Sequence, residues 1–197
     1  MEENTQKLCF IDTETTGLDA GKNGVHQISF IITDIDAEVV YETADLMFTP
    51  HPDVVRDSGH FTLKSDEELD SREMTSHEAS IEMIRVLDKH VNKYDKKDKL
   101  QFVAYNASFD EKFLRAFFEQ HSSTSFGSYF WTPSICCYAA MGFFVQSKRK
   151  HLPNMRLGTM CSCAGIAFDG GEAHDGLYDV KKTVELYKYL RQNLSVL

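Results

Sequence analysis

Two carboxylates, Asp12 and Glu14, follow the apolar run at residues 8–11 near the start of the chain. The run predicts a buried strand, and because successive side chains on a strand alternate between faces, both carboxylates should point the same way. Like charges held a few ångströms apart repel, and each disfavours ionisation of the other. A fold keeps such a pair most easily when a cation lies between them. The spacing therefore predicts oxygen ligands for a hard divalent metal, Mg²⁺ or Mn²⁺.

Two later segments place further acids where loops can converge. The turn at 106–110, Asn-Ala-Ser-Phe-Asp, follows an apolar strand and places Asp110 at the start of a helix. Near the end of the sequence, His174 comes five residues before Asp179, which falls in the first turn of the last predicted helix. Taken alone, the two acids would be ordinary helix N-terminal residues stabilised by the helix dipole. Together with the first pair they give four carboxylates and one histidine at strand ends or helix starts.

These three segments resemble the motifs of the DEDDh branch of the DnaQ-like 3′–5′ exonucleases, a family of the RNase H-like superfamily. That family carries a strand ending in Asp-x-Glu-Thr-Thr-Gly-Leu, an Asn-Ala-x-Phe-Asp turn, and a His with an Asp five residues later. This chain has the same residues at 12–18, at 106–110, and at His174 and Asp179, in the same order. The likeness covers residue 7 to about residue 192. Gly176 is one departure, because many relatives have Ala there, and we expect either small residue to let the helix pack closely.

The resemblance implies a metal-dependent hydrolase. It implies that two Mg²⁺ (or Mn²⁺) ions are bound by four carboxylates: Asp12, Glu14, Asp110 and Asp179. One ion would activate a water for in-line attack on the terminal phosphodiester, and the other would stabilise the leaving 3′-oxygen. His174 would be the general base, since an unperturbed imidazole pKa lies near the operating pH.

The resemblance also implies a grip on the terminal nucleotide. The residues expected to contact it are Thr15, Thr16, Gly17, Leu18, Asn106 and Phe109. The family implies that Leu18 wedges against the last base, so that the strand enters frayed and single-stranded. Phe109 either stacks on a base or belongs to the core, and both interpretations stay open. For Asn106 we also expect a structural role, bonding local backbone in its turn.

The elements that must position these residues follow from periodicity and turn signals. Strands are predicted at 7–12, 25–34, 39–48 and 100–105, and residues 50–74 as a loop with short helical turns. A capping box at 75–78 predicts a helix with Ile81, Ile84, Leu87 and Val91 on one face. Further helices are expected at 109–121, 135–144, 155–163 and 176–194, with a loop at 122–134. The resemblance adds an α/β fold, an RNase H-like mixed five-stranded sheet flanked by helices, as a single exonuclease domain over 1–197.

The composition narrows the function classes. The 197 residues are 42% hydrophobic and 26% charged, with a net charge of −9, which argues against broad electrostatic binding of duplex nucleic acid. A basic patch at 147–151 with Arg156 is either a solvated loop or a guide for a strand end.

The five cysteines are an odd number, and with a polar, acidic N-terminal sequence they predict reduced thiols and a cytoplasmic protein. No apolar run reaches the ~20 residues of a membrane helix, and Cys161 and Cys163 do not match a zinc motif.

We therefore expect a 3′–5′ exonuclease that releases nucleoside 5′-monophosphates from single-stranded or frayed DNA. An exoribonuclease that trims RNA ends is the alternative within the class, because the motifs serve both substrates. A non-catalytic nucleic-acid-binding module on the same fold is the alternative from another class. For partner proteins, a homodimer and a polymerase are left open, and a free-standing enzyme is favoured.

Overall fold

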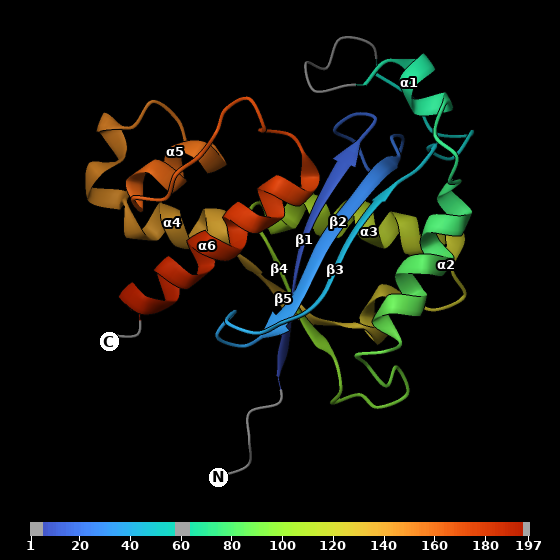
Figure 1. Ribbon diagram of the computed structural model, residues 1–197, viewed down its shortest axis with the longest axis horizontal. Helices are drawn as coiled ribbons and strands as arrows, with labels where there is room; N and C mark the ends of the chain where they lie inside the picture. Colours follow the sequence, from blue (N-terminus) through green and yellow to red (C-terminus); the bar gives the residue numbers. More distant parts are fainter. Residues whose placement is uncertain (1–5, 58–63, 195–197) are drawn as a thin grey trace.

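A five-stranded sheet in the order β3-β2-β1-β4-β5 forms the centre of the molecule (Figure 1). The computed structural model describes residues 6–57 and 64–194 of the chain. The strands are β1 (Lys7–Thr15), β2 (Val25–Asp34), β3 (Val40–Met47), β4 (Leu100–Ala104) and β5 (Phe130–Cys136). Strands β1, β2 and β3 pair antiparallel, whereas β4 and β5 run parallel to β1. The sheet is mixed and five-stranded, as predicted.

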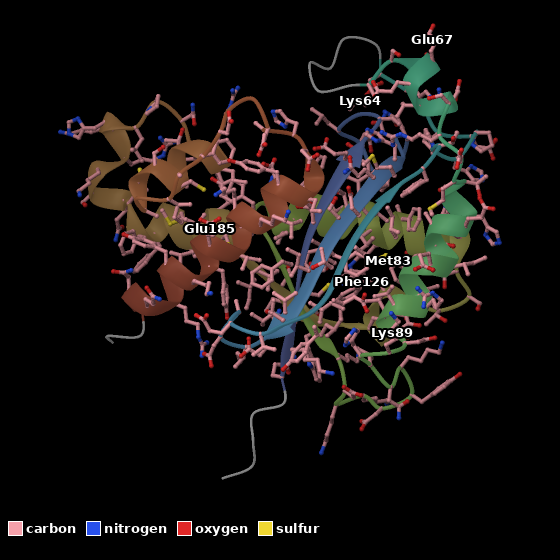
Figure 2. All side chains as sticks on the ribbon, in the orientation of Figure 1. Lys64, Glu67, Met83, Lys89, Phe126 and Glu185 are labelled. Carbon is pink, nitrogen blue, oxygen red and sulfur yellow. The ribbon has the colours of Figure 1, made fainter. Side chains whose placement is uncertain are left out.

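Helices cover both faces of the sheet (Figure 1). The helices are α1 (Asp66–Asp70), α2 (Ser76–Leu87), α3 (Ala107–His121), α4 (Cys137–Phe144), α5 (Leu157–Cys163) and α6 (Gly176–Leu194). Two 3₁₀ helices, η1 (Phe126–Ser128) and η2 (Gln146–His151), lie in the connections. One core cluster joins the sheet to α2 and α3 and includes Met83 and Phe126, both labelled in Figure 2; a second joins it to α4, α5 and α6.

Alternation along β1 connects these two cores to the acidic pair. Cys9 and Ile11 pack on the side of α2 and α3, while Phe10 packs on the side of α6, where its ring meets Tyr187 edge-on. By the same alternation, Asp12 and Glu14 continue the Phe10 face. On one side β1 pairs with β2 as far as Thr15, and α6 packs against the face that carries Phe10. The pair is therefore presented towards the N-terminal end of α6, not to open solvent.

Two predictions about strands were wrong. Strand β1 does not stop at residue 12 but continues through Thr15, so the acids lie within it and not after it. The segment 122–134, predicted as a loop, contains η1 and most of β5, and Ile135 belongs to that strand, so α4 begins only at Cys137. Pro133 misled the prediction, because proline cannot donate to a ladder. It is accommodated because β5 is an edge strand, paired only with β4.

Helix α2 confirms its predicted start and most of its predicted face. The Thr75–Glu78 capping box is present, with both reciprocal hydrogen bonds. Leu87 is buried and Ile84 packs against the core, as predicted, whereas Ile81 is 55% exposed and Ala79 and Met83 complete the buried face. Val91 is buried but lies beyond the helix end.

Other expectations hold. The predicted apolar face of α3 is buried: Phe113, Leu114, Phe117 and Phe118. Helix α6 spans the predicted residues, and α5 starts two residues later than expected. Helix α1 lies in the predicted loop 50–74, of which 58–63 fall outside the described residues.

All five cysteines are free thiols, as predicted. Within residues 6–57 and 64–194, no helix is both long and apolar enough to cross a membrane.

Candidate active site

The Asp12–Glu14 pair meets the two later acids at one cavity. This cavity of about 310 Å³, called the site cavity below, is lined by residues of β1, α3 and the start of α6. Its lining includes all five predicted catalytic residues: Asp12, Glu14, Asp110, His174 and Asp179. Strands β1 and β4 are parallel, so their carboxyl ends lie at the same edge of the sheet, where α3 and α6 also begin (Figure 1).

Asp110 reaches the site because β4 is shorter than β1. The β1–β4 pairing ends at Phe10 and Val103, which leaves the next part of β1 without a strand partner on that side. The Asp110 carboxylate fills the gap: its Oδ1 accepts 3.0 Å from the Thr13 backbone N–H and 2.9 Å from the Thr13 hydroxyl. Asp110 is 4% exposed. These two bonds fix the orientation of the Asp110 carboxylate relative to β1.

Asp179 lies in the first turn of α6 and is linked to His174. Its Oδ2 accepts a 3.3 Å bond from the His174 backbone N–H, while its buried Oδ1 has no hydrogen-bond partner among the described residues. His174 has a positive φ of 70°, a conformation that histidine adopts more readily than most residues other than glycine. The His174 side chain is exposed, which suits a group that must meet substrate.

The start of α6 packs against β2 more tightly than the sequence suggested. A Cβ at Gly176 would lie 2.6 Å from the Ser29 hydroxyl oxygen, which is too close for any real contact. That hydroxyl is held in place, because it donates a 2.7 Å bond to Asp45. The expectation that Gly or Ala would serve equally at 176 is therefore wrong for this chain, since Ala would displace either Ser29 or the helix that carries Asp179.

The four acids hold their protons more tightly than ordinary acids do. Burial, followed by the charges of the neighbouring acids, raises the pKa of Glu14 to about 8 and that of Asp12 well above its usual range. Burial raises the pKa of Asp110 to about 7, although the Thr13 bonds oppose the shift, and that of Asp179 to about 6. Each shift means that full ionisation of the cluster is unfavourable unless positive charge is supplied.

The donor set fits hard divalent cations. Four carboxylates converge on one cavity, and Asp179 Oδ1 is a buried oxygen whose hydrogen-bonding capacity is unused among the described residues. Within that part of the chain, no three His, Cys, Asp or Glu side chains are yet close enough together to enclose an ion. To hold a cation, the carboxylates would have to turn inward, which their mutual repulsion opposes until the positive charge is present.

The predicted nucleotide contacts divide into two groups. Thr15 and Leu18 line the site cavity, and Leu18 is 65% exposed, as a wedge would need to be. Thr16 and Gly17 do not line it. The Thr16 hydroxyl donates to the Val55 carbonyl, and a Cβ at Gly17 would collide with the side chains beside it. Their contacts hold the loop after β1, so any effect on substrate is exerted through that loop.

Phe109 and Asn106 both line the site cavity. Phe109 is partly buried, packs on the core and meets Phe113 with ring centroids 4.8 Å apart, so the core role is present, while stacking on a base stays a prediction. Asn106 is the residue before α3, but its side chain makes no capping bond to the backbone, contrary to expectation. The side-chain amide oxygen of Asn106 instead accepts a 3.2 Å bond from the Ser108 hydroxyl.

The sequence analysis missed two residues of the site, Thr13 and Tyr105. Both line the site cavity, and no motif marks either residue.

Sequence comparisons find related proteins over most of this chain. A sequence model of the family described as "RNase_T: Exonuclease" matches residues 9–187. Ribonuclease T of Vibrio parahaemolyticus is 25% identical over 190 residues, which are 90% of this chain and 81% of that protein. Ribonuclease T of Histophilus somni is 33% identical over 95 residues, covering 48% of this chain and 40% of that protein.

Solved structures show the same fold. Exonuclease I of E. coli, in a zinc-bound complex with single-stranded DNA, superposes with a TM-score of 0.75 at 19% identity over 96% of this chain. Exonuclease I of Methylocaldum szegediense superposes with a TM-score of 0.69 at 20% identity over 96% of this chain. In both cases the match spans only 41% of the larger protein.

Proposed function

Since the chain belongs to the exonuclease family and is a 3′–5′ exonuclease, we propose that it removes nucleotides from single-stranded or frayed DNA ends with two bound Mg²⁺ or Mn²⁺ ions. One observation carries the proposal: four carboxylates, an exposed histidine and the wedge residue Leu18 line the same cavity. A surface acid cluster would not need a neighbouring base, and a core acid cluster would not open to substrate.

The residues that line the site cavity have defined tasks in this proposal. The carboxylates of β1, α3 and α6 hold the ions, which when bound lower the pKa of the attacking water and offset charge on the leaving oxygen. His174 accepts the proton of that water, because its side chain is exposed at the cavity. Leu18 and Phe109 contact the terminal base and exclude a paired strand.

The choice between DNA and RNA is part of the proposal. The described relatives give different indications, because the curated ones are named Ribonuclease T while the Exonuclease I structures hold single-stranded DNA. We place DNA first, since no side chain in the sequence marks recognition of a 2′-hydroxyl. An exoribonuclease remains the second candidate, favoured by the relative that aligns with 90% of this chain.

A paired degradation assay tests both points. The purified chain is incubated with matched 5′-labelled single-stranded DNA and RNA, in Mg²⁺ or Mn²⁺ and then in EDTA. We expect a ladder of shortening products on DNA that disappears in EDTA. Faster shortening of RNA would move the proposal to the second candidate. No ladder on either substrate in either metal would leave only a non-catalytic binding module.

The expected partners and location are proposals as well. Size-exclusion chromatography with light scattering tests the homodimer, and co-purification with a polymerase tests the proofreading role. The cytoplasmic location expected from the free thiols is checked by cell fractionation.

A further inference from the structure

A second cavity opens on the same carboxylates from the side of α4 and α5. It measures about 940 Å³, about three times the site cavity, and shares Asp12, Tyr105, Asn106, His174 and Asp179 with it. We call it the α4–α5 cavity. Away from the shared wall, its lining includes Tyr138, Arg149, Asn154, Arg156, Thr159 and Phe168. Figure 1 shows α4, α5 and the segment before α6 on one side of the sheet, which is where these residues belong.

Tyr138 lines this cavity, and contacts with Tyr105 hold its ring in place. The Tyr105 hydroxyl donates a hydrogen bond to the Met155 carbonyl, which joins the end of β4 to the segment before α5. Tyr138 packs edge-on against Tyr105, with ring centroids 5.9 Å apart and planes at 90°. The Tyr138 backbone N–H also donates 2.7 Å to the Tyr105 carbonyl. Tyr138 is nevertheless 43% exposed, so a fixed ring faces the cavity.

The acidic and basic side chains that line the α4–α5 cavity lie at opposite ends of it. Among the described residues that line it, the only acids, Asp12 and Asp179, lie at the end shared with the site cavity, whereas Arg149 and Arg156 lie away from that end. Arg149 is exposed in η2 and forms no ion pair with any described residue. The two arginines therefore form a basic end of a cavity whose other end is acidic. They attract an anion that extends away from the carboxylates.

We propose that the α4–α5 cavity binds the single-stranded nucleic acid on the 5′ side of the scissile phosphate. The proposal rests on the proposed function, because a phosphodiester at the carboxylates must have a nucleoside on each side. The terminal nucleoside carries no further 3′-phosphate and suits the smaller, acid-lined cavity. The remaining strand carries one phosphate per nucleotide and needs the larger cavity with arginines. Arg149 contacts a phosphate, and Tyr138 stacks on a base.

Length-dependent binding without hydrolysis tests this assignment. Fluorescence anisotropy measures the affinity of labelled thymidine oligonucleotides of two and six residues, in EDTA and separately in Ca²⁺. We expect the hexamer to bind the wild type more tightly than the dimer. Arg149→Ala should weaken hexamer binding and reduce the slope of log affinity against log salt by ~0.7, the value for one lost phosphate contact on a single strand. Tyr138→Ala should weaken it about tenfold without changing the slope.

Matched controls come from the same two helices. Lys150→Ala removes a cation beside Arg149, and Phe143→Ala removes an aromatic ring from the helix of Tyr138; neither residue lines the cavity. Both controls should bind the hexamer like the wild type, and Tyr138→Phe should retain the stacking. The assignment is overturned if Lys150→Ala matches Arg149→Ala, if the Arg149 and Tyr138 variants bind the hexamer normally, or if affinity does not rise with length in either buffer.

The two proposals, hydrolysis and strand binding in the α4–α5 cavity, would fail with different experimental results. If the wild type shows length-dependent binding that Arg149→Ala weakens, but no degradation in Mg²⁺ or Mn²⁺, the cavity assignment stands and the hydrolytic function falls. If degradation occurs while hexamer binding is insensitive to both substitutions, the function stands and the upstream strand follows another path.

Discussion

The Asp110 carboxylate takes the place of a missing strand partner for Thr13. Its Oδ1 accepts both the backbone N–H and the hydroxyl of Thr13, at 3.0 and 2.9 Å, where β4 has already ended. One residue on the far face of β1 therefore orients an acid that belongs to α3. Thr13 itself does not supply a carboxylate, but it determines which oxygen of Asp110 is left for other ligands.

Thr13→Val should impair metal use more than it impairs folding. The substitution removes the hydroxyl bond to Asp110 and keeps the backbone bond, so the carboxylate gains freedom to rotate. We expect the Mg²⁺ concentration for half-maximal activity to rise about tenfold or more, since a hydrogen bond to a charged group contributes ~1.5–3 kcal/mol. Activity measured across a Mg²⁺ titration checks this. Thr13→Ser restores the hydroxyl and should behave like the wild type; an unchanged titration for the valine variant would contradict the role.

The position of Thr13 also shows what sequence can and cannot predict here. Alternation on one strand was enough to place Asp12 and Glu14 on one face, because that relationship is local. The Thr13–Asp110 contact depends on where β4 stops relative to β1, a relationship across 97 residues that no pattern within either strand encodes. The edge strand β5 was missed for a similar reason: Pro133 is tolerated only because no strand pairs on the outer side.

Metal-free protein should lose stability as the pH rises from about 6.5 to about 8. Folding raises the pKa of Asp110 to about 7 and of Glu14 to about 8, so the folded state holds protons that the unfolded state has already released. Stability must fall with pH in that window. His26 and His121, whose pKa values burial lowers to about 3 and about 4, act oppositely, but only below an unfolded pKa of ~6.5.

Thermal unfolding in EDTA at pH 6.5, 7.2 and 8.0 measures this slope. Each kcal/mol corresponds to about 2–4 °C for a chain of this size, so a decline of a few degrees is expected. Saturating Mg²⁺ should flatten the slope, because the ions offset the charges that ionisation creates. A melting temperature that rises with pH over this window in EDTA would show that folding does not raise the pKa values of these acids.

Asp12→Ala should abolish activity while leaving the fold intact. The pKa of Asp12 is raised by burial and by the nearby charges of Asp110, Glu14 and Asp179, so removing this carboxylate relieves repulsion. We expect the metal-free melting temperature at pH 8 to be equal to or higher than that of the wild type. A large drop would mean that Asp12 has a structural role. Loss of the stabilisation by Mg²⁺ in the same variant would confirm that it is a ligand.

His174 should be tested by substitution with Asn as well as with Ala. The residue has a positive φ of 70°, which Asn tolerates better than Ala, so His174→Asn removes the imidazole with less backbone strain. Loss of a general base should slow cleavage by ~10²–10⁴ in both variants. A Mn²⁺ titration of the melting temperature should match the wild type for the Asn variant. Parallel loss of Mn²⁺ affinity and rate would make His174 a ligand and not the base.

Gly176→Ala should slow the enzyme through a collision across the sheet, and a second substitution should relieve it. An alanine Cβ would lie 2.6 Å from the Ser29 hydroxyl oxygen, which Asp45 holds in place, so the start of α6 and Asp179 must shift. Ser29→Ala removes that oxygen and leaves the Ser29 Cβ at 3.3 Å, a tight but tolerable contact. Turnover and melting temperature of the two single variants and the double variant form a complete cycle. We expect Gly176→Ala to lose most of its activity, Ser29→Ala to lose little, and the double variant to recover a large part of the loss. A double variant as slow as Gly176→Ala would show that the Ser29 contact does not set the position of Asp179.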